Sequence, residues 1–170
     1  MKNLILIAMS ACLAAAFLGC WADKQEGVND AKTLRFCSKS SSEGLLLVDI
    51  LDVQSGRRIA EVETKASVYH RFVLNWIAPD KILLISSDIG DKVIIVGDTC
   101  ECHYASVVIT PECAEAQLYE YSAKGGGRVI LGTIKFDKNI LLNDKRVNKK
   151  YLEFKDIPAN EEAEKKPLGP

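Results

Sequence analysis

The segment DTCECHYASVVITPEC, residues 98–113, contains the side chains best suited to chemistry: Cys100, Cys102, His103 and Cys113. Thiolate and imidazole groups are preferred ligands of zinc and cuprous copper, so this set could bind a soft metal ion. However, Cys102 and His103 are adjacent, and adjacent side chains of a strand point to opposite faces. A metal site formed by these four residues is therefore the alternative interpretation of the segment, not the favoured one.

Disulfide bridges are the favoured use of the cysteines. An even set of four, namely Cys37, Cys100, Cys102 and Cys113, follows the apolar N-terminal run. An even set in an exported chain predicts two structural bridges. Cys100 and Cys102 lie too close in sequence to bridge one another easily, so each is expected to pair with Cys37 or Cys113. The two pairings that satisfy this condition both stay open.

The N-terminus has the layout of an export signal. Lys2 is the only charged side chain before Asp23, and residues 4–18 are apolar apart from Ser10 and Cys12. A short basic start followed by an apolar run of this length is typical of a secretory signal. A transmembrane helix needs roughly 20 apolar residues, so the run is short for a membrane span.

The end of this run, Phe17-Leu18-Gly19-Cys20, resembles the lipobox of bacterial lipoprotein precursors. The resemblance implies that residues 1–19 are a cleaved signal peptide and that Cys20 receives the diacylglycerol and acyl groups, such as palmitate. Trp21 stands where an aspartate would signal inner-membrane retention, which favours the outer membrane, facing the periplasm. A cut after Ala22 would instead release a soluble periplasmic or secreted protein.

Composition points to one globular domain with short polar flanks. The chain has 170 residues, of which 48% are hydrophobic, and a formal net charge of −1. This charge balance offers no basic face for nucleic acid. Residues 20–33 are expected to form a flexible tether and residues 158–170 a disordered tail, because neither has enough apolar side chains to bury. The β-rich domain is expected over residues 34–157.

Short runs of β-branched and aliphatic residues dominate that domain, and turn dipeptides such as Ser55-Gly56 and Pro79-Asp80 separate them. This pattern predicts a mainly β protein, an antiparallel β-sandwich or small barrel of about seven to nine strands. Residues 111–121 are predicted to form a short helix, or else a turn followed by a strand at 117–122. The runs lie at 45–53, 57–63, 68–76, 81–87, 92–98, 105–110, 128–136 and 146–154.

No motif indicates catalysis or a cofactor. The chain has two histidines, His70 and His103, and neither Gly-x-Ser-x-Gly nor His-Glu-x-x-His. Tyr119 and Tyr121 could form a recognition face, although cross-strand packing is the favoured interpretation. We therefore expect a cell-envelope lipoprotein with a non-catalytic binding or scaffold domain, attached to the membrane by its lipid and partnered by another envelope protein. The alternative is a periplasmic metal-handling protein.

Overall fold

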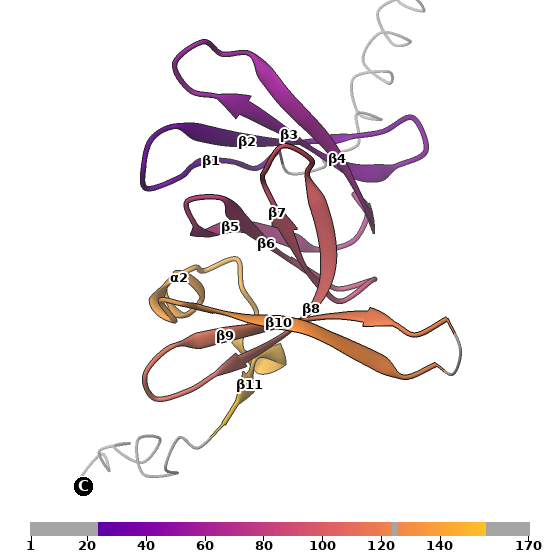
Figure 1. Cartoon of the computed structure of the whole chain (residues 1–170), viewed down its shortest axis with the longest axis vertical. Helices are drawn as coiled ribbons and strands as arrows, with labels where there is room; N and C mark the ends of the chain where they lie inside the picture. The colour runs from indigo at the N-terminus through magenta and orange to yellow at the C-terminus, as the bar shows by residue number, and fades with distance from the viewer. Residues whose placement is uncertain (1–23, 124–125, 156–170) are drawn as a thin grey trace, which may run out of the picture.

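The computed structural model describes residues 24–123 and 126–155, which form two packed β-sheets (Figure 1). Over these residues the strand order is β1-β2-β3-β4 in one sheet and β10-β9-β8-β7-β6-β5 in the other, where β11 also pairs with β8. All pairings are antiparallel except that of β11. The predicted mainly β fold is confirmed as a sandwich, and the sheets do not close into a barrel.

The four-stranded sheet has one buried and one solvated face. Along β2 and β3 every second side chain is buried, as expected for a sheet that covers a core on one side. Its outer face bears charged pairs, including Lys39 with Asp49 at 2.9 Å and Arg58 with Glu61 at 3.0 Å. The strands are β1 (Glu26–Val28), β2 (Leu34–Ser40), β3 (Leu45–Asp52) and β4 (Arg58–Ser67).

The seven-stranded sheet is covered on both faces along β6 and β7, where three consecutive residues of each strand are buried. Two-sided burial explains why their sequences are continuously apolar rather than alternating. The strands are β5 (Phe72–Ala78), β6 (Lys81–Ser86), β7 (Asp91–Ile95), β8 (Glu101–Ile109), β9 (Ala114–Tyr121), β10 (Arg128–Phe136) and β11 (Glu153–Phe154).

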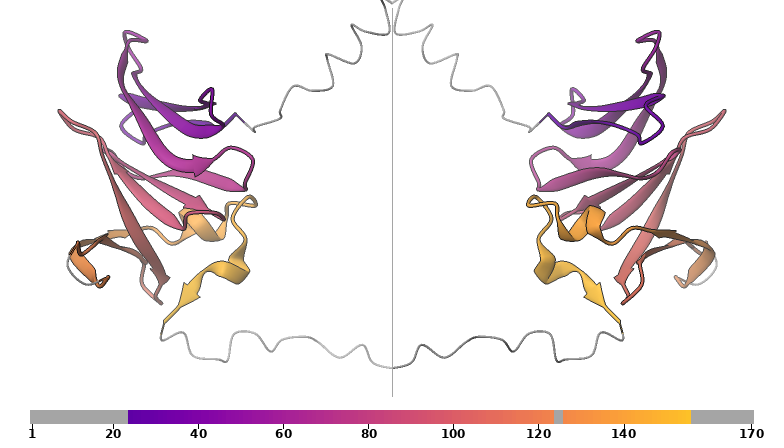
Figure 2. Two further views of the ribbon diagram at one scale, coloured as in Figure 1. Left: turned by 90° about the vertical axis from the view of Figure 1, so that its right-hand side faces the viewer. Right: turned by 90° about the vertical axis from the view of Figure 1, so that its left-hand side faces the viewer.

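Two hydrophobic clusters lie on the two sides of this larger sheet. The first fills the space between the sheets, with Leu46 and Val48 facing Leu74 and Ile82. The second lies on the opposite face and is closed by the segment that follows β10, whose Leu141 is fully buried. That segment contains the one-turn helix α2 (Asn139–Leu142) and the 3-10 helix η1 (Lys149–Tyr151). The C-terminal segment therefore completes the core (Figure 2).

The predicted flexible tether is wrong from Gln25 onward. Gln25 and Asn29 are buried, and β1 between them pairs with β2. The Asn29 amide donates to the Pro79 carbonyl at 2.6 Å, and the Trp76 indole donates to Gly27 at 3.0 Å. Polar side chains hold this segment in place, so its lack of apolar residues does not leave it disordered.

The alternatives for residues 111–121 are resolved as a turn followed by a strand. Thr110 closes the turn by accepting a hydrogen bond from the Cys113 backbone at 3.1 Å, and β9 begins at Ala114. The expected strand at 146–154 is mostly absent, because the Asn148 side chain accepts from Lys150 and caps η1. Only its end forms the short β11.

Within the described ranges, no helix has the length and apolarity needed to traverse a bilayer. The predicted signal peptide, the lipidation site Cys20 and the tail at 158–170 lie outside the described residues.

Candidate ligand-binding pocket

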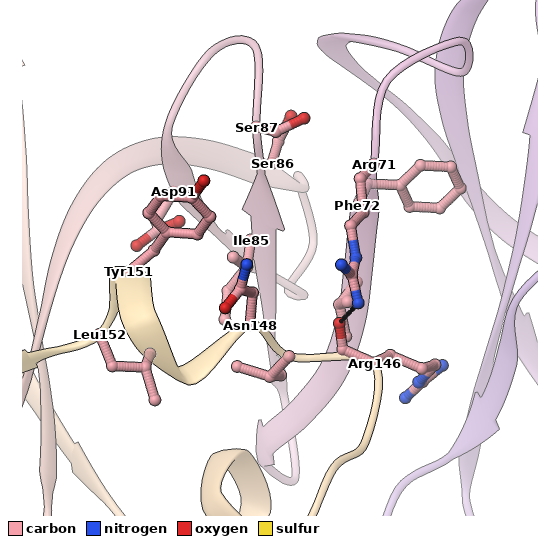
Figure 3. A pocket seen from close by; sticks show the side chains of 12 residues that line it. Arg71, Phe72, Ile85, Ser86, Ser87, Asp91, Arg146, Asn148, Tyr151 and Leu152 are labelled. Atoms are coloured by element: carbon pink, nitrogen blue, oxygen red, sulfur yellow. Dashed lines mark hydrogen bonds between the residues drawn. The ribbon is translucent and has the colours of Figure 1, made fainter.

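A pocket of about 380 Å³ lies between the seven-stranded sheet and the C-terminal segment (Figure 3). Its floor comes from β5 and β6, and its cover from residues 146–152. The apolar lining residues are Phe72, Val73, Ile85, Val147 and Leu152, and the polar ones are Arg71, Ser86, Ser87, Asp91, Arg146, Asn148 and Tyr151. A mainly apolar hollow with a few polar groups is the common form of a small-molecule site.

Strand pairing places a carboxylate on this apolar floor. Val73 of β5 pairs with Ile85 of β6, and Asp91 starts the neighbouring strand β7, opposite Ala105 of β8. Asp91 is on the same face of β7 as Val93, which belongs to the cluster under the C-terminal segment. The Asp91 carboxyl group therefore lies in an apolar row at the edge of the pocket.

This setting raises the pKa of Asp91 to about 6, because burial disfavours its charged form. A hydrogen bond from the Ser86 backbone lowers the pKa, but by less. No Lys, Arg or His among the described residues forms an ion pair with Asp91. Near neutral pH the pocket thus holds a desolvated carboxylate that forms no ion pair with the two arginines of its wall. Such a group is a candidate for ligand recognition.

A hydrogen-bonded clamp forms the opposite wall. The Arg146 guanidinium donates to Asp144 at 2.6 Å and to Asn75 of β5 at 3.2 Å. Its third contact, at 3.0 Å, is with the side chain of Gln25. Arg71 in turn donates to the Arg146 carbonyl at 2.7 Å (Figure 3). These bonds hold the cover of the pocket against β5.

The predicted disulfides do not form, and all four cysteines of the described chain are free thiols. Cys37 faces the outer side of the four-stranded sheet, since its neighbours Phe36 and Ser38 are buried. Cys100 and Cys102 pack instead against the cluster between the sheets. Cys113 lies at the far end of β8, roughly 20–25 Å from Cys102 by strand length. These positions are too far apart or turned apart for bridging.

The alternative metal set is not brought together either. His103 lies 2.9 Å from Glu101 and 3.6 Å from Glu120, on the face of β8 opposite to Cys102. Among the residues that the structure describes, no group of three or more potential ligands is placed to hold a metal ion. Burial raises the pKa of the Cys102 thiol, which makes it less reactive.

No sequence motif points to the pocket residues. They come from β5, β6, the start of β7 and residues 146–152, so no local spacing relates them. The one local signal is Asp91, a carboxylate directly after the turn at Gly90 and at the head of an apolar strand. No protein-family model, curated protein or solved structure matches this chain.

Asp91→Asn should increase stability at neutral pH. Because the folded pKa of Asp91 is above its ordinary value, the folded state binds the extra proton between about pH 4 and pH 6, and stability falls as pH rises through that range. We expect the variant to be more stable than the parent by about 2–3 kcal/mol at pH 7 and nearly equal at pH 4. Urea unfolding at both pH values measures this. Asp98→Asn, at an exposed carboxyl, is the control, and an Asp91 variant that is less stable at pH 7 contradicts the assignment.

Asp144→Asn should weaken the clamp. Hydrogen bonds from Arg146 lower the pKa of Asp144 to about 2, so its contribution is complete above about pH 4 and is lost as pH falls toward 2. The free energy of unfolding should drop by about 1–2 kcal/mol at pH 7. The difference from the parent should disappear near pH 2. The exposed Asp30→Asn serves as the matched control in the same denaturant series, and an equal effect of both substitutions would rule out the clamp.

Proposed function

We propose that this chain is a lipid-anchored cell-envelope protein whose β-rich domain binds a ligand in its pocket and performs no reaction on it. The ligand is a small molecule or side chain with a cationic group on an apolar body. The anchor is Cys20, and the outer membrane, facing the periplasm, is the favoured location. The partner held at that surface is another component of the envelope.

The observation that supports ligand binding is the carboxylate of Asp91. A desolvated carboxylate without an ion-pair partner makes the folded state less stable at neutral pH, so folding gives no reason for its presence. A bound ammonium or guanidinium group would supply the missing charge. The apolar floor at Val73 and Ile85 would contact the body of the same ligand.

The position of Gln25 supports a domain held close to the membrane. Gln25 is buried, and four residues separate it from Cys20. A fully extended chain covers at most about 3.5 Å per residue, so a lipid on Cys20 would keep the fold within roughly 20 Å of the anchor. Gln25 also contacts Arg146 in the pocket wall, so an anchor at Cys20 would lie near the pocket.

Hexylamine, hexanoate and hexanol share an apolar body and differ in charge, so together they test the ligand class. We expect hexylamine to bind best to the purified protein at neutral pH, because its ammonium group can pair with Asp91. Its advantage over hexanol should be lost in Asp91→Asn. Titrations followed by backbone NMR signals of β5 and residues 146–152 measure both.

The Asp98→Asn variant should bind as the parent does. Binding of hexanoate as tight as that of hexylamine, or signal changes confined to other parts of the domain, would exclude the proposed ligand class.

Cys20→Ser should abolish lipidation. We expect the parent to partition into detergent phase and to carry three acyl chains in its intact mass, because the Cys20 thiol would receive a diacylglycerol with two chains and the amine freed by cleavage a third. The variant should lose the acyl mass and the detergent partitioning. Cys37→Ser is the matched control and should remain lipidated. A parent chain without acyl groups, cut after Ala22 or uncut, contradicts the anchor.

A further inference from the structure

A ladder of aromatic rings and cations crosses one face of the seven-stranded sheet, from the buried Lys92 and Tyr119 to the exposed Tyr121 and Arg128. Tyr104 of β8 stacks on Tyr119 of β9 with ring centres 5.8 Å apart, and Tyr121 meets both rings edge-on. Lys92 lies 4.4 Å from the centre of the Tyr104 ring, and Arg128 lies 4.3 Å from that of Tyr119. The second of these contacts holds the Arg128 guanidinium over the Tyr119 ring, at the edge of the sheet.

The strand at this edge, β10, is unusually apolar for a position open to solvent. Val129, Ile130 and Leu131 are 50%, 50% and 46% exposed. Within the described residues β10 pairs with β9 alone, so its other side has no neighbouring strand. A long, apolar, unpaired edge is a template for addition of another strand.

The backbone of β10 offers hydrogen-bonding groups along this edge. Ser122 donates to the Gly127 carbonyl, so Gly127 faces β9. Because hydrogen-bonding direction alternates along an antiparallel pair, Arg128 and Ile130 present their N–H and C=O groups outward. A bulge after Ile130 interrupts this order, so the accessible template is the first half of β10.

The charged side chains of β10 favour an acidic strand over a second copy of this chain. Arg128 forms no ion pair with any carboxylate in the described part of the chain, and Lys135 near the other end of β10 is paired with Glu115 at 3.1 Å. A second copy added antiparallel over this first half, with Arg128 opposite Ile130, would make the Arg128 side chains of the two chains diagonal neighbours on one face. Like charges in cross-strand neighbours are destabilising. An acidic strand from a different protein avoids this repulsion and gives Arg128 a carboxylate.

We propose that β10 and the adjoining tyrosine ladder form a docking site for an extended acidic segment of a second protein, which adds as a strand to β10. Backbone hydrogen bonds at Arg128 and Ile130 give the affinity, as in other cases of strand addition. Carboxylates of the segment contact Arg128, and its apolar side chains cover Ile130 and Leu131. The buried Tyr119 phenol stays protonated, because burial and a hydrogen bond with Tyr121 raise its pKa, so it adds no negative charge.

The site is placed where a partner can reach it. The β9–β10 hairpin and the start of the described chain lie on opposite sides of the molecule (Figure 2). If the chain is anchored at Cys20, as the proposed function has it, β10 faces away from the membrane. The docking site itself does not require the anchor or the pocket.

A synthetic peptide of alternating valine and glutamate is the probe, and a valine–lysine peptide is its charge-reversed control. We expect the acidic peptide to shift backbone NMR signals of β10 in the purified protein and to bind more weakly as salt rises. Arg128→Glu should weaken it by about tenfold. Arg57→Glu, at an exposed position in the β3–β4 turn, should leave binding unchanged.

Strand addition is separated from plain charge attraction by the same acidic peptide with alternate backbone amides methylated. This peptide keeps its carboxylates but cannot pair with an edge, so its binding should be lost while the protein is untouched. Equal binding of the acidic and basic peptides, retained binding of the methylated peptide, or a β10-dependent dimer of the protein would each overturn the proposal. None of these results tests ligand binding at Asp91, which is measured by the NMR signals of β5 and residues 146–152.

Discussion

One buried side-chain amide, that of Gln25, joins three parts of the chain that are far apart in sequence. It donates to the Phe72 carbonyl at 2.8 Å and accepts from the Leu74 backbone at 3.0 Å, both in β5. It also accepts from Arg146, and the Gln25 backbone donates to Ser38 of β2. An unmet hydrogen bond in such a position costs about 1–3 kcal/mol, so the four contacts must form together. These contacts fix the position of the four-stranded sheet relative to Arg146 in the pocket wall.

The pocket follows from the need to cover both faces of the seven-stranded sheet. Strands β6 and β7 are apolar on both faces, so each face needs a cover. The four-stranded sheet covers one face, while the other depends on a C-terminal segment with little regular structure. That segment packs closely where Leu141 and Val147 enter the core. Where it rises into the clamp at Arg146, the space beneath it is left open over Asp91, and this space is the pocket.

Local patterns predicted most of the strands, because their signal lies in neighbouring residues. Residues 128–136 form β10 as predicted, and the turn at Gly56 has the positive φ of 68° that favours glycine. The segment around Gln25 could not be predicted in this way, since its order comes from polar contacts with β5 and Arg146. The disulfide prediction was wrong for a related reason. An even number of cysteines suggests bridges, but the direction of the Cys37 side chain, outward from the four-stranded sheet, is known only once the sheet is formed.

The two proposed sites need opposite environments, a pocket closed to water at Asp91 and a strand edge open to solvent at β10. The fold places these environments at different ends of one sheet. A dry pocket disfavours the charge of Asp91 but strengthens its attraction for a cationic ligand, and the clamp provides one wall of that pocket close to Gln25. A docking strand needs a rim without a cover, and β10 extends beyond the area that the four-stranded sheet protects. Because the smaller sheet covers β5–β7 and leaves the apolar residues of β10 exposed, one sheet offers both environments. Binding at the inner end therefore leaves the outer edge free for a partner.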